Sequence, residues 1–111
     1  MAYDEELADR IRESLESDAG VREKKMFGGL AFLVHGNMAI AASGQGGLLV
    51  RVDPAGSDEL ITATGARRFE MGGREMRGWL RVDADRFTPD ADLDRWVAVG
   101  VAFARSLSPK R

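Results

Sequence analysis

Hydrophobic residues recur at helical spacing near both ends of the chain. Near the start, Leu7, Ile11 and Leu15 follow one another at four-residue intervals, so their side chains share one face of a helix running from about Asp4 to Ser17. Asp4 is a suitable N-cap for this helix. We therefore expect an amphipathic N-terminal helix that buries one face.

A longer amphipathic helix is predicted at the end of the chain. Thr88 is a good N-cap, and Pro89 suits the first helical position because its missing N–H has no partner there. Apolar or small residues then follow at spacings of three and four: Leu93, Trp96, Gly100, Phe103 and Leu107. This spacing gives the helix one apolar face for burial, and Ser108-Pro109 ends it.

Between the two helices the hydrophobic period becomes that of β-strands. A polar strand, suited to the edge of a sheet, is expected over Val21–Met26, whereas Leu30–His35 is apolar on both faces, as in a central strand covered on both sides. Gly36-Asn37 is the predicted turn into Met38–Ala42, because both residues accept the positive φ of tight hairpins. A second glycine-rich turn leads to Leu48–Val52, which completes a meander.

A short helix and two more strands are expected further along. The helix is predicted over Ser57–Thr64, and the strands over Arg67–Met71 and Gly78–Val82. Together the elements predict an α+β fold, with a single antiparallel sheet of about five strands and the N- and C-terminal helices packed on it. At 111 residues the chain has the size of one domain, which we assign to residues 1–111.

Composition narrows the chemistry that this chain can perform. It has no cysteine and His35 is its only histidine, which excludes disulfides, thiolate nucleophiles and a Cys/His zinc site built by this chain alone. A lone imidazole beside a turn is more typical of a strand end than of a catalyst, and no nucleophile has an assignable base. We predict no catalytic residue, no metal ligand and no cofactor, with Mg²⁺ held by carboxylates alone as an open alternative.

Charge and hydropathy bear on partners and location. The 16 Lys and Arg nearly balance the 18 Asp and Glu, for a formal net charge of -2, so contact with nucleic acid or anionic lipid would need a local patch. No run of 18 apolar residues predicts a membrane span. The acidic start lacks the basic and then apolar pattern of a signal peptide. We expect a cytoplasmic protein.

A first group of candidate contact residues lies on the predicted edge strand. Strand alternation places Arg22 and Lys24 on one face and Lys25 on the other. These cations are interpreted either as contacts to phosphate or to an acidic partner, or as charges that prevent edge-to-edge pairing of sheets.

A second group combines two arginines with a tryptophan. In a strand, Arg77, Trp79 and Arg81 would share one face, where they could stack a base or grip the backbone of a partner. In the alternative interpretation, Trp79 packs under a terminal helix while the arginines extend past it to water.

The run from Lys24 to Met38 has the sequence KKMFGGLAFLVHGNM. It resembles the signature of the TfoX/Sxy N-terminal domain family, and Met76-Arg77-Gly78-Trp79 and the closing segment from Trp96 to Leu107 extend the resemblance over essentially the whole chain. The positions shared with the family motif are Met26, Phe27, Gly28, Gly29, Gly36, Asn37 and Met38. The resemblance implies that these residues form a bend and a hairpin.

The family is named for bacterial regulators of natural competence, which are similar to two-domain proteins with a further C-terminal domain. Because this chain stops just after its second long helix, it resembles a free-standing form of the N-terminal module. It brings no agreed catalytic residues to this chain.

Three functions stay open. The first is a non-catalytic binding module that modulates transcription through contact with a protein partner. The second is direct nucleic-acid binding through the edge-strand cations and the Arg-Trp-Arg face. The third is an enzyme or small-ligand binder that uses Asp, Glu, Lys or Arg in a pocket. Homodimerisation through an exposed strand is compatible with all three.

Overall fold

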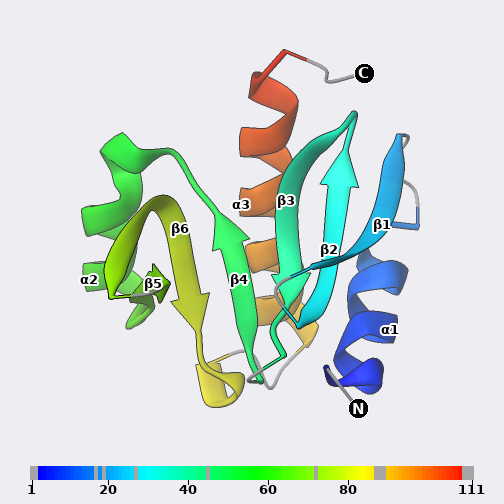
Figure 1. Cartoon of the computed structure of the whole chain (residues 1–111), viewed down its shortest axis with the longest axis horizontal. Helices are drawn as coiled ribbons and strands as arrows, with labels where there is room; N and C mark the ends of the chain where they lie inside the picture. The colour runs from blue at the N-terminus through cyan, green and yellow to red at the C-terminus, as the bar shows by residue number, and fades with distance from the viewer. Residues whose placement is uncertain are drawn as a thin grey trace.

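The computed structural model describes residues 3–16, 18, 20–26, 28–44, 46–71, 73–86 and 90–108 (Figure 1). The helices are α1 (Glu5–Ser14), α2 (Ser57–Thr64) and α3 (Asp90–Ser106), with short 3₁₀ turns η1 (Pro54–Gly56) and η2 (Ala84–Arg86). The strands are β1 (Val21–Met26), β2 (Gly29–Val34), β3 (Asn37–Ala42), β4 (Leu48–Arg51), β5 (Arg67–Met71) and β6 (Arg74–Val82).

All of these strands form one antiparallel sheet in the order β1-β2-β3-β4-β6-β5. The α+β fold is confirmed, but the described residues form six strands rather than about five. The strand β1 has its predicted bounds and lies at an edge of the sheet. The strand β6 begins at Arg74, not at Gly78, because the left-handed φ of 82° at Gly78 bends the strand without ending it.

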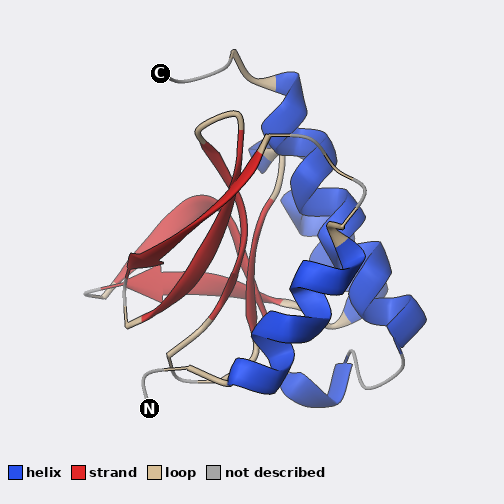
Figure 2. Ribbon diagram, turned by 90° about the vertical axis from the view of Figure 1, so that its right-hand side faces the viewer, coloured by secondary structure: helices blue, strands red, loops and turns tan. Residues whose placement is uncertain are grey.

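The helices cover one face of the sheet (Figure 2). Of these, α3 packs across β3 and β4, and α1 lies against α3. No described helix lies over the opposite face, which is turned toward the viewer in Figure 1. We call this opposite face the open face. The apolar pattern of Leu30–His35 predicts a strand covered on both sides, whereas the described helices cover it on one side only.

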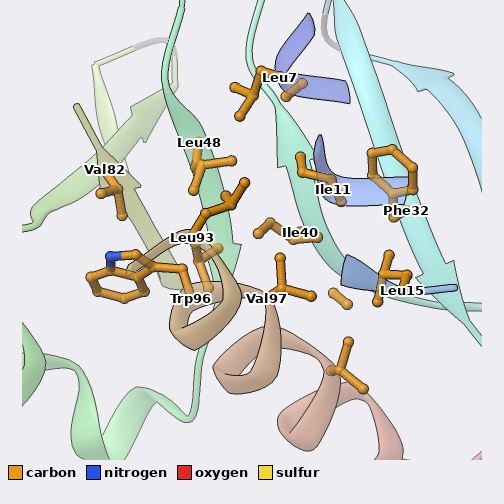
Figure 3. Close-up of a cluster of buried hydrophobic side chains, with 14 of the residues drawn as sticks. Leu7, Ile11, Leu15, Phe32, Ile40, Leu48, Val82, Leu93, Trp96 and Val97 are labelled. Carbon is orange, nitrogen blue, oxygen red and sulfur yellow. The ribbon is translucent and has the colours of Figure 1, made fainter. Parts of the chain in front are cut away.

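The main core fills the space between the helices and the sheet (Figure 3). Ile11 from α1 and Leu93 from α3 are at most 1% exposed and point toward one another across Ile40 of β3. Burial confirms the apolar spacing predicted for the N-terminal helix and for Leu93, Trp96 and Gly100, whereas Phe103 and Leu107 are only partly buried. Full burial of each such side chain contributes about 1.5–3 kcal/mol.

An ion-pair group joins α1 to the edge strand β1. The guanidinium of Arg12 donates to both carboxylate oxygens of Glu23, each at 2.7 Å, and to Asp9 at 2.6 Å. These hydrogen bonds favour the charged carboxylate, so Arg12 lowers the pKa of Glu23. At its N-terminus α1 is capped as predicted, since Asp4 accepts from the backbone N–H of Leu7 at 3.2 Å.

The backbone of α3 lies directly against β3 at Gly100. A Cβ at this position would lie inside the van der Waals distance of the Ala39 carbonyl oxygen and 3.0 Å from its carbon. Glycine here lets the helix backbone rest directly on β3. The predicted cap Thr88 and Pro89 lie outside the described residues.

Candidate functional site: the open face of the sheet

The hairpin between β2 and β3 turns one residue earlier than predicted. His35 and Gly36 occupy the turn with φ values of 50° and 83°, the pair of positive values typical of a type I′ turn. The prediction of Gly36-Asn37 was wrong because Asn37 belongs to β3. There it is 1% exposed, and its Nδ2 donates to the Ser108 carbonyl oxygen at 2.9 Å.

The other described residues of the family motif also shape the backbone. Gly28 has a φ of 73° in the turn between β1 and β2. A side chain at Gly29 would run into the Ala42 carbonyl oxygen of the neighbouring strand β3. Phe27 and the side chain of Met26 lie outside the described residues. The described part of the motif thus builds the β1-β2-β3 corner, and Met38 is its member on the open face.

One row of residues crosses the open face through every strand. Direct cross-strand partners share a face of the sheet. The pairing therefore places the following side chains side by side, from β1 to β5: Lys24, Ala31, Ala41, Leu49, Arg81 and Arg67. Cations stand at both ends of this row, and the three central positions are apolar.

Neighbouring side chains cover the apolar centre of this row, where Ala31, Ala41 and Leu49 are at most 5% exposed. Leu33 is paired with Arg22 on one side and with Met38 on the other. Leu33, Met38, Phe69 and Trp79 are partly buried and pack against Ala31, Ala41 and Leu49, in a cluster separate from the helix-covered core. The interpretation in which Trp79 packs under a terminal helix was therefore wrong.

The cations at the two sides of the open face differ in their surroundings. On the β6 side, Arg67 donates to both carboxylate oxygens of Asp83, at 2.6 and 3.1 Å, and thereby lowers the pKa of Asp83. Arg81 is bound to the Ser43 hydroxyl at 3.2 Å and to the Gly46 carbonyl oxygen at 2.8 Å.

The cations on the β1 side have no such ion pair. Arg22 and Lys24 are exposed, and neither forms an ion pair with another described residue. Lys25 is paired with Leu30 and lies on the face opposite Lys24, as predicted; this is the helix-covered side. Arg22, Lys24, Trp79 and Arg81 thus share the open face, whereas the side chain of Arg77 lies outside the described residues.

The strand carboxylates lie on the other side of the sheet. Glu23 is paired with the core residue Phe32, and its carboxylate is bound by Arg12 of α1. Glu70 is paired with Glu75, which approaches Arg68 at 4.0 Å beside α2. On the strands, the open face thus carries the cations Arg22, Lys24 and Arg81, and Asp83, just after β6, is bound there by Arg67.

One cleft of about 170 Å³ is lined by Asp58, Arg68 and Glu75 and reaches Trp79 of the open face. Another of about 350 Å³ lies between α2 and α3 over Trp96. The carboxylates with a displaced pKa, Glu23 and Asp83, line neither of them. Within the described ranges, no three His, Cys, Asp or Glu side chains gather as metal ligands.

Comparison with known proteins gives one family. The family described as TfoX N-terminal domain matches residues 5–104 of the 111-residue chain. No curated protein and no solved structure matches. Among the described helices, none is long and apolar enough to cross a membrane.

Proposed function

This chain belongs to the TfoX N-terminal domain family, and from that premise we propose that it is a non-catalytic binding module whose open face contacts another protein. The observation that carries the proposal is the apolar cluster of this face. Leu33, Met38 and Trp79 are partly exposed there, although β2 has the apolar pattern of a strand covered on both sides. These side chains cover Ala31, Ala41 and Leu49, which are at most 5% exposed, and keep part of their own apolar surface accessible. Accessible apolar surface rimmed by charged residues is a mark of interaction sites.

The proposal includes a regulatory role. The family is named for regulators of natural competence, so we expect a partner linked to transcription. Contact with such a partner would take place in the cytoplasm. The described glycines of the family motif shape turns and close strand contacts, so we assign them a structural role. We therefore expect the partner to contact the open face and not these glycines.

Site-specific cross-linking in cells tests this proposal. A photo-reactive benzoylphenylalanine is introduced in place of Met38, on the open face, and as a matched control in place of Ala102, exposed on α3. We expect a transcription-linked protein to be cross-linked from position 38 and not from position 102. The same adducts from both positions, or no protein adduct from position 38, would contradict the proposal.

Direct binding of nucleic acid is the second candidate, because Arg22, Lys24, Trp79 and Arg81 share one face. It predicts that an oligonucleotide binds and that its affinity falls steeply with added salt. Fluorescence anisotropy with mixed DNA and RNA pools measures both. Binding at low salt that Arg81→Ala leaves unchanged would remove this candidate.

A further inference from the structure

We propose that the cleft between α2 and α3 binds a small carboxylate with an apolar body, whose oxygen accepts a hydrogen bond from the indole N–H of Trp96 and lies beside Arg86. The cleft is formed by the two helices and η2, on the side of the sheet away from the open face. This inference therefore goes beyond the proposed function and does not depend on it. It adds a small-molecule ligand to a chain whose proposed partner is a protein.

The cleft is an unfilled space with an apolar wall. Its volume of about 350 Å³ is at the lower end of the range for small-molecule pockets. The apolar lining comes from Leu60 and Ala63 of α2 and from Trp96 and Val99 of α3. Leu60 and Val99 pack against the core, yet part of their surface is accessible. A small apolar body can therefore be buried here without displacing a core side chain.

The indole N–H of Trp96 is a donor without an acceptor. Trp96 is 6% exposed, and its ring extends from α3 away from Val97 (Figure 3). Its nitrogen has no hydrogen bond to a described residue, although the N–H of a buried tryptophan usually finds such a partner. Among the described residues no fully enclosed side-chain nitrogen lacks a partner, so this nitrogen reaches the accessible part of the ring. Of the described clefts, this one alone is lined by Trp96, so the N–H opens into it.

Arg86 supplies positive charge at the rim of the cleft. Its guanidinium carbon lies 2.8 Å from the position that a Cβ would occupy at Gly65, the C-terminal cap of α2. The negative end of the helix dipole favours a cation there, which holds this side chain beside the cleft. Arg86 forms no ion pair with a described carboxylate, and Asp83, on which its charge acts, is bound by Arg67. Its guanidinium N–H groups can therefore donate to an anionic oxygen.

The other charges of the rim limit the charge of the ligand. Arg95 lies 3.7 Å from Asp92 on the same helix, so these two compensate each other, and Asp85 is exposed next to Arg86 on η2. Two arginines and two carboxylates make the rim formally neutral, which disfavours a dianion such as a phosphate ester. An ammonium group would be repelled by Arg86 and would leave the Trp96 N–H without an acceptor. A carboxylate satisfies both groups with a single negative charge.

The test uses three probes that share one apolar body and differ in their polar end: hydrocinnamate, its primary amide and phenylpropylamine. Each is titrated at pH 7 into the full chain labelled with ¹⁵N. The indole N–H signal of Trp96 reports directly on the proposed donor. The indole N–H of Trp79, the second tryptophan of the chain, is the internal control, because Trp79 lies on the open face.

We expect hydrocinnamate to shift the Trp96 indole signal and not that of Trp79, with a dissociation constant on the order of 1 mM for so small a probe. The amide should bind about fivefold more weakly, and the amine more weakly still, because the charge-assisted hydrogen bond is lost. Arg86→Gln should weaken hydrocinnamate binding by about fivefold to tenfold. Arg22→Gln makes the same charge change on the distant edge strand β1 and should alter the affinity by less than about twofold.

A second variant fills the cleft without touching the core. Ala63 is exposed on α2 and lines the cleft, so Ala63→Leu should abolish the shift of the Trp96 signal. The Trp79 signal shows whether this variant is folded. Ala102→Leu, the same change at an exposed position of α3 outside the cleft, should bind hydrocinnamate as the wild type does.

Each contrary result overturns a defined part of the inference. If the amine shifts the Trp96 signal at the same concentration as hydrocinnamate, the carboxylate assignment is wrong. If Arg86→Gln binds hydrocinnamate as tightly as the wild type, Arg86 is not part of the site. If none of the three probes moves the Trp96 signal, the cleft is not a site of this kind. The proposed function is decided separately, by cross-linking from position 38.

Discussion

Replacing Gly100 by alanine is expected to destabilise this protein, although the same change in an exposed helix is stabilising. Two effects of opposite sign compete. In a helix interior, alanine is favoured over glycine by about 1 kcal/mol. At Gly100, however, the added Cβ would lie inside the van der Waals distance of the Ala39 carbonyl oxygen and 3.0 Å from its carbon.

The structure indicates which effect is larger. The obstacle is strand backbone, which cannot rotate away as the end of a flexible side chain can. The helix α3 must therefore lift from β3, and a gap of about 0.5–1 Å removes a quarter to a half of the dispersion attraction between the facing atoms. Overpacking of this kind costs about 1–3 kcal/mol, and the rigid obstacle favours the upper end. After the gain in helix propensity, the net loss is about 2 kcal/mol.

Urea unfolding followed by circular dichroism measures this loss in the free energy of unfolding. In thermal unfolding we expect Tm to fall by roughly 6–10 °C. Ala102→Gly is the control, because Ala102 is exposed on the same helix and should report propensity alone, with a loss of about 1 kcal/mol. A Gly100→Ala protein as stable as the wild type would refute the reasoning, since helix propensity would then offset the close approach.

Three further changes test other contacts. Asn37→Ala removes the hydrogen bond to Ser108, and we expect a loss of about 1–3 kcal/mol in urea unfolding, with faster amide exchange at the end of α3. Gly36→Ala places a side chain at a φ of 83°, and we expect Tm to fall through a cost of about 1–2 kcal/mol. Arg12 lowers the pKa of Glu23 in the folded state, so their ion pair stabilises the protein above the unfolded-state pKa of Glu, about 4.3. This stabilisation is lost as the pH falls through the lower pKa of Glu23 in the folded state. The Glu23→Gln protein should therefore have a lower free energy of unfolding than wild type at pH 7, and this difference should shrink as the pH is lowered below about 5. A difference that is constant with pH would contradict this assignment.

The elements of the fold could be predicted largely from local pattern. Four-residue spacing located α1, and β1 has its predicted bounds. The turn after β2 was misplaced by one residue because Gly36-Asn37 and His35-Gly36 are both acceptable turn pairs locally. What distinguishes them is distant in sequence, namely the bond from the buried Asn37 to Ser108.

The candidate site could be predicted in part. Strand alternation correctly separated Lys24 from Lys25, because it depends only on the two-residue period. The side of the sheet on which Trp79 lies could not be found in this way, since it depends on which face the helices cover. Leu33 was not singled out as a site residue, and its signal was the two-sided apolar pattern of Leu30–His35, whereas Met38 was named only as a position of the family motif.

The position of α3 at the end of the element order has a consequence for biosynthesis. All strands of the sheet are made before α3, yet the core they share with it includes Leu93, Trp96 and Val97. While α3 is still inside the ribosome, the face of the nascent sheet that α3 covers in the folded protein is exposed. The core is therefore completed only after α3 has emerged, and until then the apolar strands are open to binding by chaperones.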